Sequence, residues 1–151
     1  MSIRYKEGDL LEATEFMIAH QVNCLGAAGG LAAAVFDKWP EAGREYQTLV
    51  KTFGNGRSEK LLGGIHISTT PDYKIVVDLF GQYYPGQDYR PYALRSAFRQ
   101  LASLAYQLDA GVAIPYKISC GICGGDWNEV LKILEEEMQL VDCVIYKRPG
   151  D

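Results

Sequence analysis

The sequence predicts one layered α/β/α domain whose central sheet is at least partly parallel. Its 151 residues, 48% of them hydrophobic and 23% charged, suit a single globular domain with a full core. Segments with strand-like patterns alternate regularly with segments of helical periodicity. Two of the strand segments run into glycine-rich loops that open helices. Because ligands of such folds bind in the loops after the carboxyl ends of strands, we expect a site there.

Each element follows from a local pattern. Short alternating or continuous apolar runs predict strands over 3–5, 16–22, 65–68, 74–80, 112–115 and 141–146. Apolar residues on one face predict helices over 31–36, 41–53, 94–108 and 127–138. Trp39-Pro40 separates the first two helices, because proline restricts the residue before it and suits the first turn of a helix. A turn over 54–56 ends the second helix, a hairpin turn covers 69–72, and Asp126 with Glu129 has the form of a capping box.

The chain is acidic, with a formal net charge of −4 and a pI of about 5.2. An acidic protein has no general attraction for nucleic acid or for an anionic membrane, so local groups must hold any phosphate-bearing partner. No segment approaches the roughly 20 apolar residues of a membrane span, and the N-terminus has no apolar run typical of a secretory signal. We therefore expect a soluble, cytoplasmic protein whose four cysteines are free thiols.

Glycine is abundant, with 16 of 151 residues where a typical share is about 7%. Two clusters stand out, Asn-Cys-Leu-Gly-Ala-Ala-Gly-Gly over 23–30 and Ser-Cys-Gly-Ile-Cys-Gly-Gly-Asp over 119–126. Backbone N–H groups without a neighbouring Cβ can approach an anion closely, and a helix N-terminus adds partial positive charge. The two loops together predict a two-sided anion site; the alternative is two tight turns that only need a positive φ. Neither loop matches the P-loop or the Rossmann fingerprint.

Six segments, in order along nearly the whole chain, resemble the macro domain family: Gly8-Asp9-Leu10, 19–24, Gly29-Gly30-Leu31-Ala32, 77–82, 114–115 and 118–127. The resemblance implies a three-layer α/β/α fold with a mixed, largely parallel sheet, formed by residues 1–151 as a single domain. It implies ADP-ribose as ligand, with Asp9 at the adenine amino group, Asn23 at the distal ribose and the two loops at the diphosphate. For Asp9 and Asn23 the alternative is a role in stabilising turns.

The binding residues that the resemblance implies lie in three segments. They are Gly8, Asp9, Leu10, Val22, Asn23, Cys24, Gly26, Gly29, Gly30, Leu31, Ala32, Ser119, Cys120, Gly121, Ile122, Cys123 and Gly124.

A narrower resemblance is to the ADP-ribose 1''-phosphate phosphatases. It lies in His20 three residues before Asn23, in Asn23-Cys24-x-Gly26, in Trp39-Pro40-Glu41-Ala42 with Tyr46, and in Leu61-Leu62-Gly63. It implies a phosphoric monoester hydrolase, without metal or cofactor, that converts ADP-ribose 1''-phosphate to ADP-ribose and phosphate with His20 as catalytic residue. A histidine with a pKa near neutrality can donate a proton or position water. The alternative is a core histidine satisfied by a backbone carbonyl.

Departures from these patterns leave other functions open. The loop from Asn23 to Gly30 is one residue shorter than in those phosphatases. The terminal ADP-ribose glycohydrolases use a lysine on the strand that corresponds to 65–68 and an aspartate at the position of Cys123. This chain has no lysine over 65–68, so we do not expect their reaction route. A non-catalytic ADP-ribose reader and a hydrolase that removes ADP-ribose from modified protein or nucleic acid remain alternatives. Cys120-x-x-Cys123 also admits a thiol oxidoreductase, although no further ligands complete a zinc site. We expect a monomer that binds a small nucleotide, with no membrane partner and no general nucleic-acid binding.

Overall fold

The computed structural model describes residues 2–53 and 58–151. Its strands form one mixed sheet in the order β1-β6-β5-β2-β4-β3. Their bounds are β1 (Ile3–Glu7), β2 (Met17–Gln21), β3 (Ile65–Thr69), β4 (Ile75–Leu79), β5 (Val112–Pro115) and β6 (Cys143–Lys147). Neighbouring strands are parallel except for β3 and β4, which form an antiparallel pair. The expected mixed, largely parallel sheet is confirmed, while the turn expected over 54–56 lies outside the described residues.

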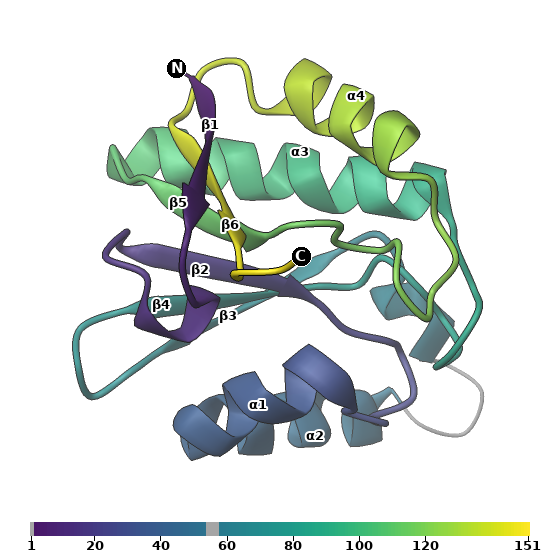
Figure 1. Ribbon diagram of the computed structural model, residues 1–151. Coiled ribbons are helices and arrows are strands. Elements are labelled where there is room, and N and C mark those ends of the chain that lie inside the picture. The colour runs from purple at the N-terminus through teal and green to yellow at the C-terminus, as the bar shows by residue number, and fades with distance from the viewer. Residues whose placement is uncertain (1, 54–57) are drawn as a thin grey trace.

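Helices cover both faces of the sheet (Figure 1). One layer contains α1 (Gly30–Lys38) and α2 (Pro40–Thr52), and the other contains α3 (Pro91–Leu108) and α4 (Trp127–Glu137). Two short 3₁₀ helices, η1 (Leu10–Glu12) and η2 (Ser58–Leu61), complete the described elements. Each strand and helix expected from periodicity forms, with slightly shifted ends. None of the helices in the described part of the chain is long and apolar enough to cross a membrane.

Alternation along the central strands divides the core between the two layers. On β2, Met17 and Ala19 pack toward α3 with Phe98, whereas Ile18 points the other way and packs with Val35 of α1. All five side chains are fully buried. The parallel neighbours β2 and β5 end at the same edge of the sheet, so the loops that follow them lie side by side. These are the two glycine-rich loops over 23–30 and 119–126.

The start of α4 is where the sequence places it, but the capping interaction differs from the expected one. The carboxylate of Asp126 accepts a hydrogen bond from the N–H of Asn128 at 3.3 Å, so Asp126 is the N-cap. Glu129 does not return a bond to Asp126; its carboxylate accepts the hydroxyl of Tyr89 instead. The reciprocal capping box is therefore wrong, because a tertiary contact occupies the glutamate.

Candidate functional site

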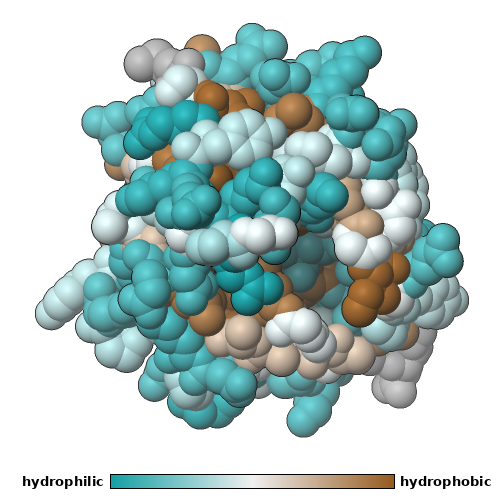
Figure 2. Space-filling model, viewed as in Figure 1, coloured by the Kyte–Doolittle hydropathy of each residue, from teal (hydrophilic) through white to brown (hydrophobic). Residues whose placement is uncertain are grey.

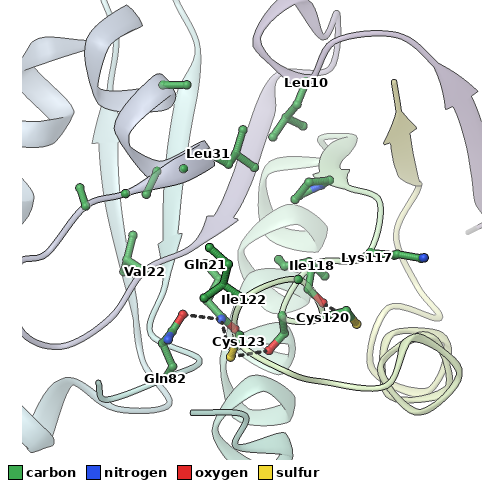
Figure 3. A pocket seen from close by; sticks show the side chains of 18 of the residues that line it. Leu10, Gln21, Val22, Leu31, Gln82, Lys117, Ile118, Cys120, Ile122 and Cys123 are labelled. Carbon is green, nitrogen blue, oxygen red and sulfur yellow. Dashed lines mark hydrogen bonds between the residues drawn. The ribbon is translucent and has the colours of Figure 1, made fainter. Parts of the chain in front are cut away.

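A cavity of about 500 Å³ lies at the carboxyl ends of β2 and β5, between the two glycine-rich loops. Figure 2 shows a hollow near the centre of this side of the molecule, and Figure 3 shows the side chains around the cavity. The volume falls within the roughly 300–1,000 Å³ of small-molecule sites. Most of the residues expected to bind the ligand line it: Asp9, Leu10, Val22, Asn23, Gly29, Gly30, Leu31, Ala32, Ser119, Cys120, Gly121, Ile122 and Cys123. The structure therefore brings the three segments together.

The remaining expected site residues do not line the cavity: Gly8, Cys24, Gly26, Gly124 and His20. Gly26 and Gly124 have φ values of +79° and +93°, a region that favours glycine, so they are needed to turn the loops. Cys24 is fully buried, and its N–H donates to the carbonyl of Tyr83 at 3.0 Å. The N–H of Gly8 extends the pairing of β1 with β6. Gly26, Gly124 and Cys24 therefore support the two loops from outside the cavity lining, Gly8 extends the sheet, and ligand contact by these four residues stays a prediction.

The first glycine-rich loop leads into α1, whose N-terminus lies at the cavity. Gly29 is the N-cap and provides no side-chain hydrogen bond. The first N–H groups of a helix have no intrahelical acceptor, so those of Gly30, Leu31 and Ala32 remain available. A Cβ built at Gly29 or Gly30 would meet no other atom within 4 Å. This end of the helix is therefore open to an anion, as the sequence predicts.

The second loop offers a further set of backbone donors. Its backbone is closed by hydrogen bonds from the N–H of Cys120 to the carbonyl of Lys117 and from that of Gly125 to Ser119, both at 2.9 Å, and from that of Gly124 to Gly121 at 3.2 Å. Among the hydrogen bonds of the described residues, none uses the N–H of Ser119, Gly121, Ile122 or Cys123. Because all four residues line the cavity, these groups can serve a ligand rather than the fold.

The side chain of Asn23 is mainly occupied by its own loop. Its Oδ1 accepts the N–H groups of Leu25 at 2.9 Å and Ala27 at 3.2 Å, and the hydroxyl of Tyr46 at 3.2 Å. Its Nδ2 donates to the carbonyl of Ala27 at 2.8 Å. An asparagine amide has two N–H donors, so one is left for a ligand hydroxyl. Asn23 therefore fixes the loop and still presents a donor at the cavity.

Asp9 also combines a local role with a free acceptor. Its Oδ1 accepts the N–H of Leu11 at 2.9 Å, which makes Asp9 the N-cap of η1. The residue is exposed and lines the cavity. Its second carboxylate oxygen makes no hydrogen bond with the described residues and can accept one from a ligand.

His20 does not reach the cavity. Its ring is fully buried, and Nε2 lies 2.7 Å from Oδ1 of Asp78 on the neighbouring strand β4. The ring packs edge-on against Phe36 of α1 at 5.2 Å between centroids, so it faces the α1–α2 layer. His20 Nδ1 and Asp78 Oδ2 are buried without a hydrogen-bond partner in the described structure. Strand alternation turns the His20 side chain into the core, so its expected catalytic role stays a prediction that this arrangement does not support.

The Cys120 thiol of the second loop is protonated at neutral pH. Burial raises the pKa of the Cys120 thiol to about 11, and the nearby Asp126 carboxylate acts in the same direction. A redox-active cysteine needs a thiolate at working pH, so this environment disfavours a thiol oxidoreductase. All four cysteines are free. In residues 2–53 and 58–151 no cluster of histidine, cysteine and carboxylate side chains is suited to a metal ion.

Sequence reasoning missed several lining residues: Gln21, Gln82, Tyr116, Lys117 and Arg148. Gln21 stands two residues before Asn23 at a strand end, and this spacing could have indicated a shared location. Tyr116, Lys117 and Arg148 directly follow the last residues of β5 and β6, so a systematic inspection of strand ends could have found them. Gln82 ends the segment over 77–82 that resembles the macro domain family and follows β4, so the same inspection of strand ends could have found it.

Comparisons with known proteins agree with this geometry. A family model described as Macro domain matches residues 19–134. The solved macrodomain of DarG from Mycobacterium tuberculosis is 27% identical, with a TM-score of 0.83, over 96% of this chain and 97% of that chain. A macrodomain protein from Streptomyces coelicolor is 26% identical, with a TM-score of 0.81, over 97% and 99% of the two chains.

A more distant match shows the fold alone. DarTG from Thermosipho africanus, solved in complex with ADP-ribose, is 18% identical with a TM-score of 0.80, over 97% of this chain and 41% of that chain. The comparison with curated proteins gave no match.

Proposed function

The chain belongs to the macro domain family, which binds ADP-ribose, and we propose that its cavity binds ADP-ribose with the diphosphate between the two glycine-rich loops. The observation that carries the proposal is the convergence of two sets of available backbone N–H groups on one cavity. Such donors, one set of them at the N-terminus of α1, stabilise a diphosphate, and the cavity lining also includes Lys117 and Arg148. This accounts for an anionic ligand on a chain with a net charge of −4.

The sheet also supports an orientation for the ligand. Asp9 follows β1 and Asn23 follows β2, and the order β1-β6-β5-β2 places two strands between them. Neighbouring strands lie about 4.8 Å apart, so the two residues are roughly 14 Å apart along this edge. The second loop follows β5, between them. Adenine at Asp9, diphosphate at the second loop and distal ribose at Asn23 therefore follow the order of the groups in ADP-ribose.

A calorimetric titration with ADP-ribose tests this proposal. We expect saturable binding to one site, tighter than that of AMP or of ribose 5-phosphate, because each of these fills only part of the cavity. Absence of binding by ADP-ribose would refute the proposal.

Exchanging Asp9 for asparagine is expected to separate its two roles. Asp9→Asn keeps the oxygen that accepts the N–H of Leu11, so the free energy of unfolding changes by only a few tenths of a kcal/mol. The carboxylate that accepts the adenine amino group becomes neutral, and we expect the Kd for ADP-ribose to rise about tenfold, since a charged acceptor strengthens a hydrogen bond by roughly 1–1.5 kcal/mol.

Calorimetry with ADP-ribose and with its inosine analogue checks this prediction. The analogue lacks the amino group, so wild type should prefer ADP-ribose and Asp9→Asn should lose most of that preference. An unchanged preference would place adenine elsewhere.

Hydrolysis of ADP-ribose 1''-phosphate is the second candidate, favoured by the resemblance of Asn23-Cys24-x-Gly26 to the phosphatases. In this reaction water attacks phosphorus, the bond to the ribose oxygen breaks, and that oxygen takes up a proton. Neither histidine of the chain lines the cavity. Catalysis would therefore depend on backbone donors and the lining Lys117 and Arg148 to stabilise the phosphoryl charge, and solvent can deliver the proton.

Release of phosphate from ADP-ribose 1''-phosphate distinguishes the enzyme from the reader. Multiple turnovers per protein molecule support the phosphatase. Binding of ADP-ribose without phosphate release would instead identify a reader, and release of ADP-ribose from modified protein or nucleic acid would identify the other hydrolase.

A further inference from the structure

The side chain of Gln21 lines the cavity and connects segments that are far apart in the sequence (Figure 3). Its Nε2 donates to Oε1 of Gln82 at 2.8 Å and to the sulfur of Cys123 at 3.5 Å. Gln21 ends β2, Gln82 follows β4, and Cys123 belongs to the second glycine-rich loop. One amide therefore joins the strand to two walls of the cavity.

Gln82 also forms hydrogen bonds with the loop after β4. Its Nε2 donates to the carbonyls of Tyr84 at 2.6 Å and Gly86 at 3.2 Å. This loop meets the second glycine-rich loop directly, because the N–H of Asp88 donates to the carbonyl of Cys123 at 3.1 Å. The bonds of Gln21 and Asp88 thus hold Cys123 at both its side chain and its backbone.

The other end of the Gln21 amide is tightly enclosed. Its Oε1 is buried and has no hydrogen-bond partner among the described residues. A Cβ at Gly81 would lie 2.2 Å from this oxygen, so only glycine leaves room for it. An unpaired buried acceptor is unfavourable, and this one persists because the donor end of the same amide is held by Gln82 and Cys123.

We propose that Gln21 is a positioning residue that sets the second glycine-rich loop for the ligand. Both of its N–H donors are used inside the protein and its oxygen is enclosed, so it acts through Cys123 rather than on the ligand. Cys123 and its neighbour Ile122 carry two of the available N–H groups. The inference rests on the proposed ADP-ribose site, because it gives Gln21 the role of holding one loop of that site in the position that binds the ligand.

Exchanging Gln21 for methionine tests the proposal, because methionine has a similar volume and no N–H donor. We expect iodoacetamide to modify Cys123, which is 7% exposed in the structure, about tenfold faster in Gln21→Met than in wild type, with tandem mass spectrometry locating the label. The Kd for ADP-ribose should rise about tenfold, as expected for a loop that has lost about one hydrogen bond. Gln107→Met is the matched control, because Gln107 is exposed on α3 and its amide donates a hydrogen bond to Ser103 of the same helix, away from the cavity.

Gly81→Ala provides an independent variant, because it displaces the Gln21 amide without removing any polar group. It should show the same faster modification of Cys123 and the same weaker binding. Wild-type labelling of Cys123 in both variants would overturn the proposal, whatever their stability. Labelling needs no ligand, so it still decides the role of Gln21 if wild type fails to bind ADP-ribose and the proposed function falls.

Discussion

Replacing Gly29 with aspartate is expected to abolish ADP-ribose binding and to leave the folded protein at least as stable as wild type. Gly29 is the N-cap of α1 with φ −130° and ψ 172°, extended backbone that any residue adopts. Aspartate is among the preferred N-cap residues, so the free energy of unfolding should stay equal or rise by a few tenths of a kcal/mol. A Cβ at this position meets nothing within 4 Å, so the protein has room for the side chain.

The same aspartate is placed where the ligand's anion is expected. Its carboxylate would accept the first N–H groups of α1 and would repel a diphosphate beside them. Loss of one or two hydrogen bonds to a charged group, at about 1.5–3 kcal/mol each, raises the Kd about a hundredfold or more. We therefore expect the variant to bind ADP-ribose more weakly while its free energy of unfolding stays equal or rises. A general folding defect would lower both binding and stability.

Calorimetry with ADP-ribose and urea unfolding measure the two effects. Gly29→Asn is the matched control, since it has nearly the same size and the same capping ability without the charge, and we expect it to weaken binding only about tenfold. Equal binding by wild type and Gly29→Asp would show that the N-terminus of α1 does not hold the anion.

The sequence is sufficient for the order of elements because the signals for them are local. The pattern of apolar residues in β2 and β5 and the proline at the start of α2 act over a few residues, and the structure follows them. The glycine-rich loops could be placed because they follow strand ends, where parallel strands bring their loops to one edge.

The direction of individual side chains depends on contacts that no local pattern encodes. His20 and Gln21 are neighbours on β2, and alternation sends His20 into the α1–α2 layer and Gln21 into the cavity. Their partners, Asp78 and Gln82, lie 58 and 61 residues further along the chain. A motif that includes His20 therefore predicts where the residue lies along the strand. It does not predict on which face of the sheet the side chain lies.

The buried pair of His20 and Asp78 gives the largest expected effect on stability. Both side chains are at most 1% exposed and are joined at 2.7 Å. His20→Ala leaves the Asp78 carboxylate in the core without its partner, and breaking a buried pair in this way costs about 3–5 kcal/mol. Urea unfolding should show this loss. His66→Ala is the matched control, because His66 also lies beside Asp78 in the sheet but pairs with the more exposed Glu45, and it should cost no more than about 1 kcal/mol.

Replacing both His20 and Asp78 tests whether the loss of stability in His20→Ala comes from the Asp78 carboxyl group that is left without its partner. Apolar side chains of similar volume often replace a buried ion pair without loss, so His20→Leu combined with Asp78→Leu should recover most of the stability lost in His20→Ala. If the double variant is as unstable as the single one, the pair itself stabilises the fold, and the unpaired Asp78 carboxyl group is not the cause of the loss.

The same pair decides how a loss of phosphate release in His20→Ala is interpreted. Because that variant is expected to be much less stable, lost turnover alone does not show a chemical role for the histidine. Asp78→Asn is more informative, since the asparagine oxygen can still accept the N–H of His20 and keep the ring in place. We expect Asp78→Asn to bind ADP-ribose and to release phosphate at the wild-type rate, because neither residue lines the cavity. A folded Asp78→Asn variant that binds ADP-ribose normally yet releases phosphate at least tenfold more slowly would show that the buried pair takes part in the chemistry.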